Sequence, residues 1–168
     1  MPQMISIVGK SGSGKTTLIE KLIPELKKRG YRIGTVKHTH HTVDADKKGK
    51  DSARHKAAGA DTVILAAQKQ IYMLKDMPCD SLESLEIYFQ DMDLVITEGY
   101  KNENRPKIEV FRMAAHKTPL YAERRDDNFA ALVTDADMGT DIPCFGMEKI
   151  TELADFIEKR FLLPQKEV

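Results

Sequence analysis

The sequence predicts an α/β fold with three layers, in which a mostly parallel sheet carries helices on both faces. Three observations support this prediction. Short apolar segments rich in branched side chains alternate with segments that repeat their apolar residues every three or four positions. A glycine-rich loop joins the first apolar segment to the first helical segment. Residues 94–97 form a continuous apolar run, which is typical of a central strand covered on both faces.

The first part of the chain is predicted to contain two strands and two helices. Residues 4–8 are apolar and branched and run directly into glycine, so we expect a buried strand. The next apolar residues recur on one helix face until a basic last turn and Gly30, and Pro24 is expected to kink this helix. A second strand is expected over residues 32–37, and a short helix over residues 52–58.

The rest of the chain continues the alternation. Strands are expected over residues 62–66, 71–74, 94–97, 108–111, 130–133 and 143–145, and helices over residues 81–89 and 150–161. Strands that alternate with helices favour a parallel sheet, because a parallel connection needs a crossover segment. The strands at 71–74 and 108–111 are candidate edges for pairing between subunits.

Length and composition favour a single domain over residues 1–168, with residues 163–168 loose. The 26 basic and 26 acidic side chains give a net charge of zero, so no overall positive charge attracts nucleic acid or an anionic membrane. No apolar stretch is long enough to span a membrane and no secretory pattern is present, so we expect a cytoplasmic protein. Cys79 and Cys144 are far apart in the sequence and are interpreted as buried or incidental thiols.

The sequence GKSGSGKT directly follows the first predicted strand and matches the phosphate-loop pattern G-x-x-x-x-G-K-[ST]. Glycines allow backbone amides to wrap closely around a phosphate, and the following helix presents its positive end to the same anion. Lys15 adds a full charge and is the predicted catalytic residue. The predicted nucleotide-binding residues of this loop are Gly9, Lys10, Ser11, Gly12, Ser13, Gly14, Lys15, Thr16 and Thr17. The motif and its position predict a P-loop NTPase fold.

Lys10 is a second feature of this loop. Its position is similar to that of the extra lysine in deviant phosphate loops, where that residue reaches the nucleotide of a facing subunit. The alternative interpretation is an ordinary solvated lysine, and both remain open at this point.

A nucleoside triphosphate site of this type also needs an acidic residue near Mg²⁺. Asp93 and Glu98 flank the apolar run at 94–97. Ligands of parallel α/β sheets lie beyond the carboxyl ends of the strands, which favours Glu98 over Asp93. We therefore expect Thr16 and Glu98 to hold Mg²⁺ directly or through its water shell, the alternative for Glu98 being a structural salt bridge.

The polar segment after the second strand ends beside the same predicted site. It contains His38, His40, His41, Asp44, Asp46, Lys50 and Asp51. Its position indicates a switch-like loop that orders around phosphate and Mg²⁺. A transition-metal site on its histidines and aspartates is an open alternative, although adjacent histidines in one loop do not define a tetrahedron.

Asp135 follows the strand predicted over residues 130–133 and faces the same edge. A carboxylate there can accept the two hydrogen bonds that guanine offers and adenine does not. The usual guanine-reading N-K-x-D motif is missing, so a turn aspartate is the alternative interpretation.

The phosphate loop is one of several segments with a shared resemblance. They are IVGKSGSGKTTLIEKLIPELKKRG, VKHTHHTVDADKKGKDSARHKAAGA, DLVITEGYK and KIEVFR, with a weaker match in LADFIEKR. Together they resemble the MobB family of molybdopterin-guanine dinucleotide biosynthesis adapter proteins. The middle segment is the most specific one, although KKGKDS replaces a more usual proline before GKDS.

The resemblance implies GTP binding with Mg²⁺, weak GTPase activity at most, and a homodimer. It also implies assistance to the guanylyltransferase that attaches GMP to molybdopterin, and leaves open whether molybdopterin itself binds. On matching positions it points to residues 9–17 for phosphates and magnesium, and to Asp46, Lys50, Asp51 and Ser52 for the neighbouring loop.

Two other functions are weighed against this one. A P-loop kinase would transfer phosphate from ATP to a small metabolite, with residues 123–127 as an arginine-bearing lid. A nucleic-acid-associated ATPase is disfavoured by the zero net charge and by the lack of interleaved aromatic and basic residues.

Overall fold

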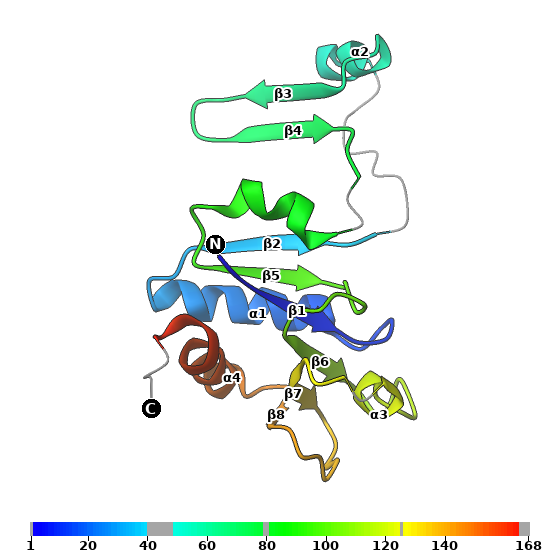
Figure 1. Cartoon of the computed structure of the whole chain (residues 1–168), viewed down its shortest axis with the longest axis vertical. Coiled ribbons are helices and arrows are strands. Elements are labelled where there is room, and N and C mark those ends of the chain that lie inside the picture. Colours follow the sequence, from blue (N-terminus) through cyan, green and yellow to red (C-terminus); the bar gives the residue numbers. More distant parts are fainter. Residues whose placement is uncertain (1, 40–48, 79–80, 125, 165–168) are drawn as a thin grey trace. The chain divides into compact units, whose positions relative to one another are not determined.

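The computed structural model describes residues 2–39, 49–78, 81–124 and 126–164 (Figure 1). The chain divides into two compact units, which are described separately. The first contains Met1–His38 and Leu85–Val168, and the second contains Thr39–Ser84. The single domain over residues 1–168 stays a prediction.

A six-stranded sheet forms the first unit. Its strands are β1 (Gln3–Val8), β2 (Ile33–Lys37), β5 (Leu94–Glu98), β6 (Lys107–Phe111), β7 (Phe129–Thr134) and β8 (Cys144–Gly146). The strand order is β2-β5-β1-β6-β7-β8, and every neighbouring pair is parallel. This arrangement confirms the predicted α/β fold with a mostly parallel sheet.

Helices connect the strands and cover both faces of the sheet. They are α1 (Lys15–Lys28), α3 (Leu120–Arg124), α4 (Ile150–Ile157), the π-helix η2 (Glu158–Leu162) and the 3₁₀-helix η1 (Leu82–Phe89), whose first residues belong to the second unit. On one face α1 and α4 bury a continuous apolar core against the strands. On the other face Leu120 of α3 packs with Val8 and Phe129. Phe89 of η1 fills the space over Gly34, where a Cβ would lie 2.5 Å from its ring.

The first helix forms as its sequence pattern predicts. Its buried residues Leu18, Ile19, Leu22 and Leu26 share one face. α1 is a single helix through Pro24 and ends before Gly30, whose φ of 93° suits only glycine well. The sheet buries β1 from Met4 to Val8 and β5 from Leu94 to Thr97, so the phosphate loop between β1 and α1 starts from a packed strand.

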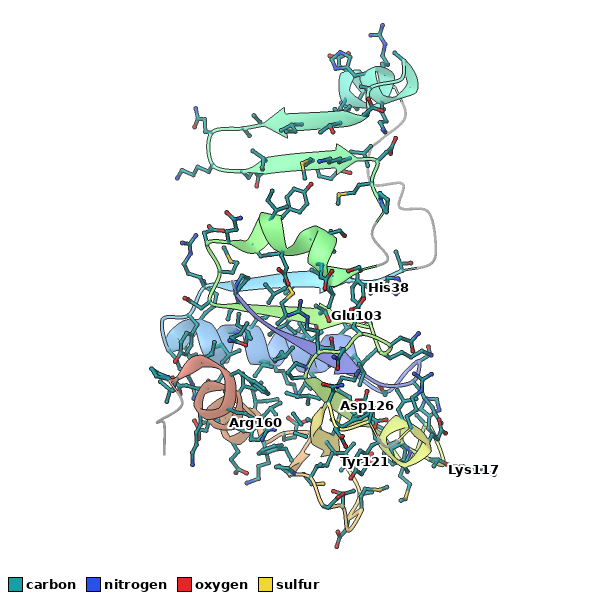
Figure 2. All side chains as sticks on the ribbon, viewed as in Figure 1. His38, Glu103, Lys117, Tyr121, Asp126 and Arg160 are labelled. Carbon is teal, nitrogen blue, oxygen red and sulfur yellow. The ribbon has the colours of Figure 1, made fainter. Side chains whose placement is uncertain are left out.

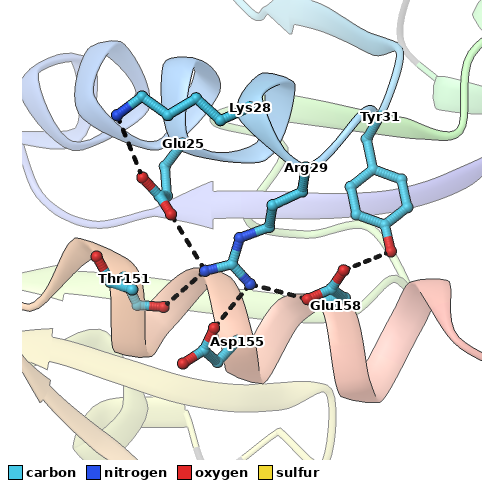
Figure 3. A network of polar contacts seen from close by, with 7 residues as sticks. All are labelled: Glu25, Lys28, Arg29, Tyr31, Thr151, Asp155 and Glu158. Carbon is cyan, nitrogen blue, oxygen red and sulfur yellow. Dashed lines mark hydrogen bonds and ion pairs between the residues drawn. The ribbon is translucent and has the colours of Figure 1, made fainter.

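A polar network fixes the end of α1 to α4 (Figure 3). The guanidinium of Arg29 donates to Glu158 at 2.8 Å and to Glu25 at 3.2 Å, and pairs with Asp155 at 2.7 Å. Tyr31 donates its hydroxyl hydrogen to the other Glu158 oxygen at 2.7 Å. Three carboxylates therefore surround one guanidinium at the edge of the sheet opposite to the phosphate loop.

The second unit contains a short helix and a hairpin. α2 spans Asp51–Ala57, and β3 (Thr62–Ala66) pairs with β4 (Ile71–Lys75) in an antiparallel two-stranded sheet. These strands form a sheet of their own, and they pair antiparallel because the segment between them is too short for a crossover. Lys56 of α2 pairs with Asp76 after β4 and donates to the carbonyl of Ala60 at 2.8 Å.

Four features differ from the sequence-based expectations. The strand at 108–111 is β6, which lies between β1 and β7 and so offers no free edge for another subunit. α3 was not predicted. The closing helix is divided into α4 and a π-helical turn. Cys144 is an exposed free thiol, which excludes the buried alternative and leaves the incidental one, whereas Cys79 lies outside the described residues. In the described part of the chain no helix combines the length and the apolar character needed to cross a membrane.

Candidate functional site

The predicted site lies at the edge of the six-stranded sheet where the strands end. Because neighbouring strands are parallel, the segments that follow them emerge at this one edge. Loop 9–14 follows β1, His38 follows β2, and Glu98 ends β5 between them. Figure 2 shows His38 and Lys117 at this end of the strands and Arg160 at the other. The structure therefore brings together residues that the sequence separates widely.

The glycines of the loop occupy conformations that other residues adopt only with strain. Gly9 has a φ of 146°, and a Cβ there would lie 2.4 Å from the carbonyl oxygen of Val110. Gly12 and Gly14 have φ values of 74° and 98°. The hydroxyl of Ser13 is buried close to Gly9 and has no hydrogen-bond partner among the described residues. The loop thus folds tightly against β6, as a phosphate cradle requires.

Lys15 reaches back across the loop from the first turn of α1. Its Nζ donates to the carbonyl oxygens of Gly9 and Lys10, both at 3.0 Å. Burial lowers the pKa of this ammonium, the negative charge of Glu98 raises it, and Lys37 lowers it. The ammonium is therefore held at the start of the loop in a partly desolvated position, where an anion is the natural partner.

Thr16 and Glu98 meet as the sequence predicts. The Thr16 hydroxyl lies 3.0 Å from both carboxylate oxygens of Glu98, and Lys37 Nζ lies 3.7 Å from one of them. A hydroxyl and a carboxylate beside a phosphate loop are the oxygen ligands that Mg²⁺ takes in such sites, so this pair fits the ion. Asp93, at the opposite end of β5, instead accepts the amide of Arg32 at 2.6 Å.

The turn after β5 is strained, and sequence reasoning missed its tyrosine. Gly99 and Tyr100 both have positive φ values, 104° and 53°. Tyr100 is buried, and its ring centroid lies 4.6 Å from that of His38. A positive φ at a bulky residue is unusual and tends to occur at functional sites. The available signal is the position of Tyr100, two residues after Glu98 and just beyond the end of a buried strand.

Asp135 lies beside the phosphate loop at the end of β7. Its Oδ1 accepts the amide of Met113 at 3.0 Å, and its Oδ2 lies 3.7 Å from Nε of Arg112. A cavity of about 260 Å³ opens here; its walls are Gly14, Thr17, Leu18, Lys21, Arg112, Asp135, Met147 and Glu148. The cavity begins at the first turn of α1, so it continues the phosphate loop toward β7.

Lys10 is held within its own chain. Its Nζ donates to Glu123 Oε1 at 2.6 Å and to the carbonyl of Thr118 at 2.9 Å. Glu123 belongs to α3, which sequence reasoning did not predict. The ammonium is thus neither simply solvated nor directed away from this chain.

The residues of the predicted switch-like loop are divided. His38 belongs to the first unit, whereas Lys50, Asp51 and Ser52 lie at the start of α2 in the second unit. His40, His41, Asp44 and Asp46 lie outside the described residues. Within the described ranges, no three His, Cys, Asp or Glu side chains gather in a way that could hold a metal ion. The grouping of these residues around a nucleotide stays a prediction.

Sequence comparisons match most of this chain to proteins of one kind. A family model described as molybdopterin guanine dinucleotide synthesis protein B, MobB, matches residues 4–135. The chain is 42% identical over 158 residues to a molybdopterin-guanine dinucleotide biosynthesis adapter protein of Haemophilus influenzae, with 92% of this chain and 87% of that protein covered. It is 36% identical over 166 residues to the protein of the same description in Escherichia coli, with 94% and 92% covered.

A solved structure supports the same relationship. The crystal structure of a molybdopterin-guanine biosynthesis protein B superposes with a TM-score of 0.75 at 29% identity. The superposition covers 92% of this chain and 97% of that one. The two chains therefore share their fold over most of their length.

Proposed function

This chain belongs to the MobB family, and on that premise we propose that it binds GTP with Mg²⁺ and assists the guanylyltransferase that attaches GMP to molybdopterin. Membership of the family supports the role of an adapter in molybdopterin guanine dinucleotide biosynthesis. The nucleotide, the metal ion and the partner enzyme are the finer parts of the proposal.

The observation that carries the nucleotide proposal is the arrangement of Lys15, Thr16 and Glu98 around one loop. The backbone of residues 9–14 and the start of α1 bind the phosphates, and Lys15 adds its charge where the β- and γ-phosphates lie. Thr16 and Glu98 hold Mg²⁺ directly or through water. When bound, the ion neutralises part of the phosphate charge.

Asp135 supports guanine as the base. The 260 Å³ cavity that Asp135 lines starts at Gly14 and Thr17, so a nucleoside attached to phosphates in the loop extends into it. Oδ1 of Asp135 already accepts the Met113 amide, which leaves Oδ2 as the better acceptor for the guanine N1–H or N2–H₂. Adenine offers neither donor in that pattern, so GTP is favoured over ATP.

Weak GTP hydrolysis at most fits the surroundings of Arg112 and Arg124. Arg112 lies beside Asp135, and Arg124 donates to the side chain of Asn102 at 2.7 Å. Both arginines are thus engaged within the chain, whereas efficient hydrolysis needs a cation on the transferred phosphoryl group. Lys15 is the catalytic residue of this slow reaction.

A homodimer is the proposed assembly, with the hairpin as its contact. β3 and β4 form a two-stranded sheet, so each strand has an outer edge, and two-stranded hairpins are marginal in isolation. Ile71 and Ile64 are 70% and 54% exposed, which is unusual for large apolar side chains. Ile64 and Ile71 lie on the same face of the hairpin, so a contact between two hairpins through this face would cover both side chains.

The test is a competition titration. Fluorescent GTP bound to the purified protein with Mg²⁺ is displaced by unlabelled GTP and, separately, by ATP. We expect GTP to displace at least about tenfold better, a difference of about 1.4 kcal/mol, and Lys15→Ala to abolish binding. Equal or better competition by ATP would contradict the guanine proposal and favour a kinase. Co-purification with the guanylyltransferase tests the adapter role, and the absence of any complex would overturn it.

A further inference from the structure

Residues 112–124, which we call the strap, consist of the segment that follows β6 together with α3, and they contact the phosphate loop. His116 Nε2 lies 2.7 Å from the carbonyl oxygen of Ser11. Lys10 Nζ donates to the strap at two points, the carbonyl of Thr118 and the carboxylate of Glu123. Three contacts therefore connect the strap to the first half of the loop.

A buried carboxylate anchors the strap to the sheet. Glu109 on β6 is only 1% exposed, and its two oxygens accept the amides of Leu120 at 2.6 Å and Tyr121 at 2.8 Å. Burial raises the pKa of Glu109, while the amides of Tyr121 and Leu120 lower it. These amides belong to the first two residues of α3, so the carboxylate of Glu109 fixes where the helix starts. Glu123, one turn later, is thereby aimed at Lys10.

The anchor and the ion pair differ in strength. The bonds of Glu109 are buried, and the apolar side chain of Leu120 adds contacts with Val8 and Phe129. The pair between Lys10 and Glu123 is accessible, with side chains 30% and 42% exposed. Accessible pairs of this kind contribute little net stability and exchange partners readily. The pair is the part of the strap that can open while the start of α3 stays in place.

We propose that Glu123 is an internal competitor of nucleotide phosphate, so that Lys10 exchanges this carboxylate for the terminal phosphate of the bound nucleotide. A polyphosphate carries more charge than one carboxylate, and Lys10 already belongs to the loop that binds it. The exchange releases the end of α3 from the loop. Tyr121 and Ala122 of the same helix line a separate cavity of about 590 Å³. The exchange therefore also changes a surface away from the nucleotide. This inference rests on the proposed nucleotide site.

The test is a double-mutant cycle on nucleotide affinity. Dissociation constants for GTP and GMP with Mg²⁺ are measured for the wild-type chain, Glu123→Gln, Lys10→Ala and the double variant. Removal of the competing charge is expected to tighten GTP binding about two- to fivefold, with a smaller effect on GMP, which lacks the terminal phosphates. In the Lys10→Ala background the Glu123 substitution is expected to have no effect.

Glu152→Gln is the matched control. Glu152 pairs with Lys149 at 2.7 Å at the start of α4, and neither residue lines the phosphate loop. This variant is expected to bind GTP as the wild type does. Glu123→Ala, with the melting temperature measured in parallel, repeats the test with a second side chain.

The outcomes separate the two proposals. Suppose that GTP binds and Lys15→Ala abolishes binding, but both Glu123 variants bind GTP as the wild type does. The proposal of an exchange is then wrong, and the proposed nucleotide site stands. Tightening that persists in the Lys10→Ala background also overturns the exchange, because the effect then does not act through Lys10. If the wild type binds no nucleotide, the proposed function fails and the exchange fails with it.

Discussion

The hydroxyl of Thr16 and the carboxylate of Glu98 lie in hydrogen-bond contact, 3.0 Å to either oxygen, although 82 positions separate them in the chain. The contact exists because β1 and β5 are parallel neighbours, with Ile7 paired to Glu98. The loop after β1 and the last residue of β5 are therefore placed side by side. If this pair holds Mg²⁺ as proposed, a change at Glu98 is expected to act on the binding of the ion and not on the fold of the loop.

Glu98→Gln is predicted to weaken GTP binding at least about tenfold in the presence of Mg²⁺ and to leave the weaker binding in EDTA unchanged. The amide keeps a hydrogen bond to Thr16 but loses the charge that attracts the ion. Isothermal titration calorimetry with and without Mg²⁺ measures both values. Asp93→Asn, at the opposite end of the same strand, is the control and should bind as the wild type does. Equal weakening by Glu98→Gln in EDTA would contradict a role through the metal ion.

Gly9→Ala is predicted to abolish nucleotide binding. The new methyl group would lie 2.4 Å from the carbonyl oxygen of Val110 and 2.7 Å from the Ser13 hydroxyl, so the loop must move away from β6. Gly30→Ala is the matched control, because Gly30 also has a positive φ but nothing lies within 4 Å of an added Cβ. That variant should lose about 1 kcal/mol of stability and keep its GTP affinity. Similar GTP affinities of the two variants would show that the close contact at Gly9 is unimportant.

The sequence predicts well which local elements meet at this edge of the sheet. The phosphate loop and the first helix depend on residues that are neighbours in the chain, and a glycine pattern between a strand and a helix has few other structural meanings. Glu98 is predictable for a related reason, since the end of an apolar strand in a parallel sheet marks the ligand edge. That single rule distinguishes Glu98, which lies at the phosphate-loop end of β5, from Asp93, which lies at the opposite end.

The parts that sequence reasoning missed depend on contacts across the chain. The bond from Lys10 to Glu123 joins residues 113 positions apart, and α3 is a five-residue helix with too few positions for an amphipathic pattern. The start of α3 is fixed by Glu109 of β6. This role becomes visible only when the structure places α3 next to β6. The positive φ of Tyr100 has no sequence signature, because side chains of its type avoid that conformation. The sequence does not show that the strand at 108–111 is internal, because a short apolar strand does not specify which strands pair with it.

Asp126→Asn is predicted to destabilise the fold at neutral pH by about 2 kcal/mol, which lowers the melting temperature by about 4–8 °C. The ammonium of Lys107 is buried and donates to Asp126 at 2.5 Å, so the substitution leaves a buried charge without its counter-charge. Asp91→Asn is the control, because its pair with Arg32 is exposed and should be worth little.

The same pair predicts a pH dependence with a definite sign. The hydrogen bond from Lys107, and then those from Asn128, hold the pKa of Asp126 below its ordinary value, so the folded state binds its proton less readily than the unfolded state. The stabilisation is complete above the ordinary carboxyl pKa and is lost as the pH falls through the lower, folded-state pKa. The melting temperatures of the wild type and Asp126→Asn should converge in acid. If the difference between the two melting temperatures stays constant between pH 7 and pH 3, the destabilisation by Asp126→Asn comes from packing and not from the lost charge.

Asp135→Asn is predicted to reduce the preference for GTP over ATP about tenfold while changing the affinity for the phosphates little. The carboxylate is the acceptor proposed for guanine, and an amide in its place offers a donor toward the guanine N1–H. The competition titration with GTP, ATP and inorganic pyrophosphate separates base recognition from phosphate binding. Pyrophosphate is the internal control, because its affinity should follow Lys15 and not Asp135. If Asp135→Asn weakens pyrophosphate as much as GTP, the hydrogen bond to the Met113 amide and the pairing with Arg112 are what matter, and Asp135 supports the shape of the loop without recognising the base.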